Sequence, residues 1–437
     1  MSRRPVIDFE SAFQRWKIRS RRSGGDDVLI LDLGQHSLNA LYAKIERDGA
    51  VGAVDYAATV DSGLSEGAVT DEAKFAAAVE RVATVLRRRN RLRTRRLQVS
   101  LSSPFISYFN HFVTVNLSPR RRVTQGLIDE SIERAGDEIS CLVEHVMQVV
   151  PVRYTLDSIY SGGGPPLGMR GQQLGIELFF LTAPEAALER IEKALKGCGY
   201  SVDGWWYAGL SAADSVMLPA AEAGVAVVDV GGATTDVAVF RNGRLLHVGV
   251  IRCGGRDFDS DLSTFLNEGL KVAEEVKRLF GCALPQVIRH NEVVDLRERG
   301  LGADKLVSAR EIAGVIRDRA RELSYMVEEE IGKAISPALL SRVVLTGGGA
   351  KLEGLAELAE IALERSVEVG APRAVNGTRM GFSDPGCAAL VGTLRLLRRR
   401  LLARRRVEPA GMSAGDRLRS WFGALVGSPV AERKEAV

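Results

Sequence analysis

The sequence predicts an α/β protein of two lobes built from a duplicated β-hairpin domain, and three stretches carry this prediction. In residues 225–240 an apolar run ends at Asp229, a pair of glycines follows, and a second apolar run rich in β-branched residues begins. Residues 29–43 repeat this layout around Asp32, and residues 343–355 lead from an apolar run into three consecutive glycines. The first two patterns are typical of a strand, a tight turn and a second strand. One such hairpin in each half of the chain indicates a duplication with a ligand clamped between the copies.

The hairpin around Asp229 has the composition of a phosphate-binding turn. Its glycine pair lets the backbone approach a ligand closely, so that N–H groups and two threonine hydroxyls can point at phosphate oxygens. Asp229 supplies the hard oxygen that hydrated Mg²⁺ prefers, directly or through water. For one such motif alone, an ordinary hairpin turn is the alternative. The predicted phosphate-binding residues of this turn are Gly231, Gly232, Ala233, Thr234 and Thr235.

The other two stretches complete a predicted nucleotide site. In the first hairpin Asp32 is the expected second metal ligand, and Gly34 and Ser37 are the expected phosphate contacts. The glycine turn of the third stretch opens a helix and suits packing against a base and ribose. Its predicted nucleoside-binding residues are Gly347, Gly348 and Gly349. Together the stretches resemble the phosphate-1, phosphate-2 and adenosine motifs of the actin, Hsp70 and sugar kinase superfamily. This resemblance implies an actin-like, two-lobed fold of duplicated ribonuclease H-like domains that binds ATP and Mg²⁺.

Length and composition limit the classes of protein to which the chain can belong. A chain of 437 residues with 46% hydrophobic content is long enough for two to four compact domains. Five scattered cysteines without a C-x-x-C pair argue against a disulfide framework and favour a cytosolic protein. No apolar run approaches the roughly 20 residues that span a bilayer, and the sequence has no Walker-type phosphate loop and no zinc-ligand spacing. The histidines are isolated and are expected to be structural or surface residues.

Three further stretches narrow the resemblance to one family. Residues 63–71, 146–157 and 166–171 are similar to segments of the cell division protein FtsA. So is the block at residues 96–176, which has the pattern of an inserted α+β subdomain. In that family the insert replaces a subdomain of actin and serves self-association and contact with later division proteins. The resemblance covers about residues 28–400.

The resemblance and the shifts in composition divide the chain into predicted domains. A basic extension at 1–25 precedes the lobe I core, which consists of 26–95 and 177–204 and is closed by a helix at 385–402; the insert at 96–176 interrupts this core. The lobe II core consists of 205–255 and 333–384, and a small lobe II subdomain at 256–332 lies between its two parts. A linker at 403–413 and an amphipathic helix at 414–427 follow. In FtsA the region corresponding to 283–332 docks the C-terminal peptide of the tubulin-like protein FtsZ.

Residues 273–281 match the A-E-x-x-K-x-x-x-G helix of the family, from which a glutamate and a lysine reach the nucleoside. The match assigns these two contacts to Glu274 and Lys277. The alternative is a solvated helix face, which is the ordinary reason for charged residues at this spacing.

Two positions depart from the family pattern. Gln35 and His36 replace small hydroxyl residues in the first phosphate loop, although Ser37 keeps one hydroxyl nearby. Ala208 stands where the superfamily commonly has a glutamate that organises metal and water, and losing such a carboxylate costs on the order of 10²-fold in hydrolysis. We therefore expect nucleotide binding with little turnover, at most a weak ATPase. The alternative is that Asp203 or Asp214 takes the place of the missing glutamate.

The C-terminal stretch predicts a membrane-targeting helix. Its apolar residues share one helical face beside two arginines, and it follows a linker rich in Pro, Gly, Ala and Ser. Burial in lipid and attraction to anionic headgroups give modest affinity for one tail, so firm attachment needs several tails acting together in a polymer. The predicted membrane contacts are Leu418, Trp421, Phe422, Leu425 and Val426, with Arg417 and Arg419.

These observations predict an FtsA-like actin homologue on the cytoplasmic face of the bacterial cell membrane, at midcell. The expected partners are the FtsZ C-terminal peptide, other division proteins through the insert, further copies of the chain, and an anionic membrane surface. Nucleic acid is not expected, because the arginine runs lack interleaved aromatic residues outside the termini. The alternatives are a small-molecule kinase of the same superfamily and a scaffold like the pilus-assembly protein PilM.

Overall fold

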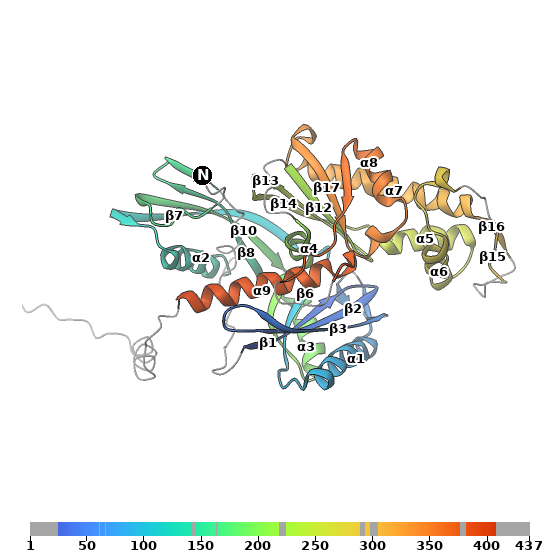
Figure 1. Cartoon of the computed structure of the whole chain (residues 1–437), viewed down its shortest axis with the longest axis horizontal. Coiled ribbons are helices and arrows are strands. Elements are labelled where there is room, and N and C mark those ends of the chain that lie inside the picture. The colour runs from blue at the N-terminus through green and yellow to red at the C-terminus, as the bar shows by residue number, and fades with distance from the viewer. Residues whose placement is uncertain are drawn as a thin grey trace, which may run out of the picture.

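The computed structural model describes residues 25–407, apart from residues 61, 66, 141–144, 163, 218–223, 289–292, 298–304 and 376–381. These residues form two lobes and an inserted subdomain (Figure 1). The predicted amphipathic helix at 414–427, and all but the last residue of the predicted extension at 1–25, lie outside the described residues. No helix in the described part of the chain combines the length and the apolar character of a membrane span.

Each lobe is built on a five-stranded sheet, and the two sheets have the same topology. In each, a central strand pairs with an antiparallel meander on one side and with two parallel strands on the other. The lobe I sheet consists of β11 (Ser201–Tyr207), β6 (Arg96–Leu101), β1 (Asp26–Leu33), β2 (Ser37–Ile45) and β3 (Val51–Val60). The lobe II sheet consists of β18 (Ser366–Val369), β17 (Leu340–Thr346), β12 (Gly224–Val230), β13 (Thr235–Arg241) and β14 (Arg244–Ile251). The predicted two-lobed α/β fold with a duplicated domain is confirmed.

The central strands form because both faces of each sheet are covered. All seven residues of β12 are buried, as expected of a continuous apolar run in a sheet with helices on both sides. On the outer face of lobe I lie α1 (Glu72–Asn90) and α3 (Glu185–Gly197), beside the short hairpin of β4 (Leu64–Ser65) and β5 (Ala68–Val69). The Asp71 side chain caps α1 by accepting a hydrogen bond from the Lys74 N–H, 3.0 Å away.

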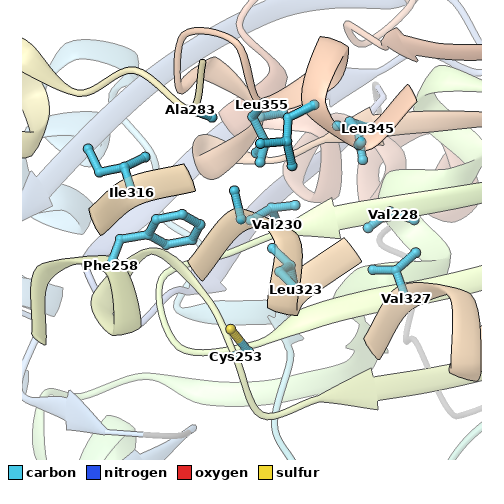
Figure 2. Close-up of a cluster of buried hydrophobic side chains, with 14 of the residues drawn as sticks. Val228, Val230, Cys253, Phe258, Ala283, Ile316, Leu323, Val327, Leu345 and Leu355 are labelled. Atoms are coloured by element: carbon cyan, nitrogen blue, oxygen red, sulfur yellow. The ribbon is translucent and has the colours of Figure 1, made fainter. Parts of the chain in front are cut away.

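The outer face of lobe II is covered by helices between residues 255 and 363, most of which belong to the small subdomain predicted at 256–332. Figure 2 shows Val228 and Val230 of β12 among Phe258, Ile316 and Leu323 from these helices. The elements are α5 (Gly255–Leu266), α6 (Leu270–Phe280), η1 (Pro285–Val287), β15 (Val293–Asp295), β16 (Leu306–Ser308), α7 (Ala309–Gly332), η2 (Pro337–Leu339) and α8 (Leu355–Leu363).

The inner faces of the two sheets share one hydrophobic core through a pair of helices, α4 (Ala208–Val216) and α9 (Ala388–Val407) (Figure 1). The helices approach closely, because a Cβ at Gly392 would lie only 1.7 Å from the Ser211 carbonyl oxygen. Buried Asp214 of α4 accepts hydrogen bonds from Arg395 (2.9 Å) and Arg399 (2.6 Å) of α9. This shared core fixes the lobes relative to each other beneath the space between them.

The inserted subdomain is an α+β unit, as predicted, and consists of a four-stranded sheet with one helix, but its boundaries differ from the predicted ones. It consists of β7 (Ser107–Arg122), α2 (Gln125–Ser140), β8 (His145–Leu156), β9 (Tyr160–Gly162) and β10 (Arg170–Ala183), in the sheet order β7-β10-β8-β9. The predicted limits of 96–176 are wrong at both ends. Residues 96–101 form β6, which pairs in parallel with β1 in lobe I, and β10 continues to Ala183.

A chain of hydrogen bonds joins the insert to lobe II. The Tyr108 hydroxyl of β7 lies 2.6 Å from His247 Nδ1 of β14, and His247 Nε2 lies 2.7 Å from Glu330 Oε1 of α7. Within the insert, the Tyr108 ring stacks on Phe179 with centroids 4.7 Å apart. His247, predicted to be a structural residue, is 4% exposed and has this structural role.

Candidate functional site

The turns of the two duplicated hairpins face each other across a cleft of about 1740 Å³. This volume exceeds the roughly 300–1,000 Å³ of a typical small-molecule pocket, so the cleft has room for a ligand the size of a nucleotide. Both lobes contribute to its lining, together with α6 and the turn after β17. The predicted site residues that line it are Asp32, Gly34, Ser37, Asp229, Gly231, Gly232, Ala233, Thr234, Glu274, Lys277, Gly347, Gly348 and Gly349.

Strand geometry brings Asp32 and Asp229 together. Each aspartate is the last but one residue of a central strand, and each strand is parallel to a neighbour whose end lies at the same edge of its sheet. In register, Asp32 is opposite Ser100 of β6, and Asp229 is opposite Thr346 of β17. The carboxyl ends of parallel strands are the usual place for ligand sites in open α/β sheets, and here two such edges meet.

Burial, and for some of them repulsion from neighbouring carboxyl groups, raises the pKa of the aspartates in the cleft. Burial raises the pKa of Asp32 from its ordinary value. Burial, with repulsion from Asp236 and Asp32, raises the pKa of Asp229 well above the usual range for aspartate. A bound cation would offset both the burial and the repulsion. No group of three or more His, Cys, Asp or Glu side chains suited to a metal ion occurs among the described residues.

Asp236 is a cleft residue that the sequence interpretation did not single out. Its Oδ1 atom accepts hydrogen bonds from the Ser102 hydroxyl of lobe I (2.8 Å) and the Tyr207 hydroxyl (2.9 Å). Burial raises the pKa of Asp236 to about 6, although these two hydroxyl donors oppose the rise. The Ser102 hydroxyl also lies 2.9 Å from the Thr234 hydroxyl, so one serine from lobe I contacts two residues of the lobe II hairpin.

The turn between β12 and β13 is held by backbone hydrogen bonds. The Gly231 N–H donates to the Thr234 carbonyl (2.9 Å) and closes the turn. The carbonyls of Gly231 and Gly232 accept from the N–H groups of Gly255 (2.9 Å) and Arg256 (2.7 Å) at the start of α5. The first turn of α5 therefore anchors the hairpin turn to the small subdomain of lobe II.

Thr235 was predicted to point its hydroxyl at phosphate, and the structure places that hydroxyl elsewhere. Thr235 is completely buried, and its Oγ1 donates to the Cys253 carbonyl oxygen, 2.8 Å away. The reason is strand alternation: Thr235 is the first residue of β13, and its side chain lies behind the turn, whereas Thr234 lines the cleft. Among the hydroxyls of this turn, Thr234 is the one placed to meet a ligand.

The glycine turn after β17 packs directly on Asp229. Gly347 has φ +84°, and a Cβ there would lie 2.1 Å from Asp229 Oδ1, so only glycine fits. The turn leads into a short 3₁₀ helix, η3 (Gly348–Lys351), and the longer helix α8 begins later than predicted, at Leu355. A second 3₁₀ turn, η4 (Pro385–Cys387), closes the loop, because the Pro385 carbonyl accepts from the Gly347 N–H (3.2 Å).

The two predicted nucleoside contacts on α6 are both engaged. Lys277 Nζ pairs with Asp259 (2.7 Å) and donates to the Gly255 carbonyl (2.7 Å). Glu274 Oε1 lies 3.2 Å from Nδ1 of His36, which belongs to the turn between β1 and β2 in the other lobe. The helix therefore lies along the cleft wall, and Glu274 and Lys277 face the cleft rather than open solvent.

The turn between β1 and β2 carries the two departures from the expected loop. The Ser62 hydroxyl fixes its path by bonding the carbonyls of Gly34 (3.0 Å) and Gln35 (3.1 Å). The Gln35 Oε1 atom is buried with no hydrogen-bond partner in the described structure. Ser37 keeps its hydroxyl at the cleft and accepts from the Asn39 amide at 3.3 Å.

Ala208 lies at the cleft wall as the first residue of α4 and is buried. Neither aspartate proposed as a substitute for the missing glutamate is placed to act in the cleft. Asp203 is paired with Arg96 and Gln98 within lobe I, and Asp214 is held by the arginines of α9. That alternative is therefore wrong.

Two matching sheets, with paired hairpin turns facing each other across a shared cleft, define an actin-like two-lobed protein. A chain of a PilM–PilN type IV pilus biogenesis complex has this fold, with a TM-score of 0.53 and 22% identity, over 85% of this chain and 99% of that chain. At this identity the likeness shows the fold alone.

The sequence comparisons find similarity to cell division protein FtsA. Residues 226–392 match the family model for cell division protein FtsA. FtsA of Escherichia coli strain K12 is 29% identical over 377 residues, covering 84% of this chain and 89% of the relative. FtsA of Pseudomonas aeruginosa is 28% identical over 372 residues, covering 85% and 89%. The chain is therefore similar to FtsA over most of its length, and the resemblance seen in its motifs is confirmed.

Proposed function

We propose that the chain is a cell division protein that binds ATP with Mg²⁺ in its cleft, associates with further copies of itself on the cytoplasmic membrane and anchors FtsZ filaments there. The observation that carries the nucleotide part is the convergence of the three motifs, which lie far apart in the sequence, on one cleft. The FtsA relationship supports the role in division.

Different residues of the cleft would bind different parts of the proposed ligand. Asp32 and Asp229 would hold Mg²⁺, whose charge would relieve the repulsion between their carboxylates. The turn at 231–234 and the turn at Gly34 and Ser37 would contact phosphate oxygens with N–H and hydroxyl groups. The glycine turn at 347–349 would pack against the nucleoside.

Slow hydrolysis follows from what surrounds the proposed phosphate site. Ala208 has no carboxylate to orient water. Asp236 is a further acidic side chain in the cleft, and two hydroxyl donors already hold one of its oxygens. We therefore expect ATP to act mainly as a bound ligand that contacts both lobes.

Equilibrium binding of a fluorescent ATP analogue, with and without Mg²⁺, tests the nucleotide function. We expect Mg²⁺-dependent binding that Asp229→Asn weakens at least about tenfold, with Asp318→Asn on the exposed surface of α7 as the matched control. Binding that is unaffected by Asp229→Asn contradicts the assignment. Phosphoryl transfer to a small acceptor at substantial rates would instead identify a kinase.

Co-sedimentation tests the membrane and partner roles. The full chain and a chain ending at Arg406 are mixed with liposomes of anionic lipid, with and without ATP and Mg²⁺. We expect only the full chain to pellet, and more of it with nucleotide if polymer formation adds tails to the assembly. Equal pelleting of both chains overturns the membrane proposal. Retention of FtsZ by the full chain tests the filament partner. We expect intact FtsZ to be retained and FtsZ without its C-terminal peptide not to be retained.

A further inference from the structure

We infer that His36 is a latch that holds the cleft closed by pairing with Glu274, and that a nucleotide binds only after this contact opens. The inference rests on the proposed nucleotide function. It gives a role to the residue at which this chain departs from the expected phosphate loop.

The latch joins the two lobes at the mouth of the cleft. His36 lies in the turn between β1 and β2 of lobe I, and Glu274 lies on α6 of lobe II. Their Nδ1 and Oε1 atoms are 3.2 Å apart. Because these residues belong to different lobes, the contact persists only while the lobes stay close.

The backbone beside His36 also lies close to the opposite hairpin. A Cβ built at Gly232 would lie 3.3 Å from both the Cβ and the backbone N of His36, and 3.8 Å from the Gln35 Cβ. The two turns that are proposed to hold phosphate are therefore close neighbours at this point. Movement of the turn that carries Gln35 and His36 would widen the space between them for phosphate oxygens.

Glu274 cannot serve the latch and a nucleoside at the same time. Glu274 lines the cleft and is one of the two residues of α6 that the motif match assigns to the nucleoside. The other proposed contact, Lys277, is held by Asp259 and Gly255 from its own lobe, so lobe opening leaves it in place. The His36 contact is the one that binding must break.

The contact between His36 and Glu274 is weak enough to open and close reversibly. The His36 and Glu274 side chains are 56% and 36% exposed, so solvent screens their attraction, and such pairs change populations by only a few-fold. Apparent affinity falls in proportion to the fraction of molecules in the open state. Removing the latch should therefore raise nucleotide affinity about two- to fivefold.

Stopped-flow binding of a fluorescent ATP analogue with Mg²⁺ separates a latch from a ligand contact. The proteins compared are the unmodified full chain, His36→Ala, and Glu275→Ala. Glu275 is an exposed carboxylate on the same helix, outside the cleft lining, so its removal changes the charge of α6 without touching the latch. Thermal unfolding confirms that each variant is folded.

The latch predicts faster association for His36→Ala, an unchanged dissociation rate, and unmodified rates for Glu275→Ala. Faster dissociation of His36→Ala would show that the imidazole contacts the nucleotide and would overturn the latch. Equal association rates in proteins that do bind would also overturn it, while leaving the nucleotide function intact. Absence of binding by every protein would overturn both.

Discussion

Ser102, the residue that follows β6 in lobe I, donates a hydrogen bond to the Asp236 carboxyl group of lobe II at 2.8 Å. Tyr207 donates to the same oxygen atom. A buried carboxyl group of lobe II in the cleft thus accepts from two hydroxyl groups that the lobe I sheet positions. Its protonation state links the stability of the protein to pH.

Asp236→Asn should stabilise the protein at alkaline pH. Burial raises the pKa of Asp236 from 3.8 to about 6, so the folded state binds this proton more tightly than the unfolded state does. The ionised carboxylate therefore costs stability above pH 6, and the cost disappears as the pH falls from 6 to 3.8. Two pKa units correspond to about 3 kcal/mol at most. The amide oxygen can still accept from Ser102 and Tyr207.

Thermal or denaturant unfolding at pH 8 and pH 4.5 measures this difference. We expect a higher midpoint for Asp236→Asn at pH 8 and a smaller gain at pH 4.5, with Asp318→Asn unchanged as an exposed control. A gain of equal size at both pH values would show that the raised pKa is not its cause.

Gly347→Ala should damage the cleft far more than Gly348→Ala. A methyl group at position 347 would lie 2.1 Å from Asp229 Oδ1 and 2.6 Å from the Val230 carbonyl, and φ is +84°. We expect a loss of about 1–3 kcal/mol in unfolding free energy and displacement of the Asp229 carboxylate. A Cβ at Gly348 meets no atom within 4 Å, so that variant is the matched control.

Nucleotide titration together with chemical denaturation tests the pair of glycine variants. Gly347→Ala should bind nucleotide at least about tenfold more weakly than the unmodified protein, and Gly348→Ala serves as the control for the unfolding measurement. Affinity of Gly347→Ala equal to that of the unmodified protein would mean that Asp229 is not needed where the structure places it.

Binding of Mg²⁺ with nucleotide should release protons. Burial and neighbouring carboxylates raise the pKa of Asp229 well above its ordinary value, so without a bound metal ion this group binds its proton more tightly than an ordinary aspartate does. A metal ion requires the ionised form and expels that proton. Calorimetric titration in buffers of different ionisation enthalpy should show release on the order of one proton, declining as pH rises. Asp229→Asn should remove the release, and identical heats in all buffers would contradict it.

Ala208→Glu should increase ATP hydrolysis. The residue lines the cleft at the start of α4, so a glutamate there adds a carboxylate near the proposed phosphate site. A positioned base contributes about 10²–10⁴-fold in favourable cases, and an unrefined replacement should recover at least about tenfold. Ala208→Gln has the same shape without the base and is the control. Equal phosphate release by both variants would show that position 208 is not the water-orienting position.

The duplication was predictable because it depends on local pattern. Each apolar strand that ends in an aspartate and a glycine turn is readable within about fifteen residues, and the structure forms a hairpin at both places. The start of the insert was not readable in this way. Residues 96–101 look like any apolar strand, and only their parallel pairing with β1 assigns them to lobe I.

The cleft residues that sequence reasoning missed depend on distant partners. Nothing in the local sequence distinguishes Asp236 from other strand residues. Its place in the cleft depends on the fold, which brings Ser102, 134 positions earlier, into contact with it. A signal for Ser102 existed, since it directly follows a strand parallel to β1, where ligand-facing side chains gather. The contact of His36 with Glu274 had no local signal, because it exists only where the two lobes meet.

The packing of α9 sets an order for the maturation of the newly translated chain. This helix, which ends at Val407, packs against β1, β2 and β6, and Arg398 reaches the carbonyl of Gly49 although 349 positions separate them. Every strand of the lobe II sheet is synthesised before α9 leaves the ribosome. Lobe I, although it is made first, therefore waits for the final helix before its inner face is covered. The half of the molecule that emerges earliest is the last to be completed.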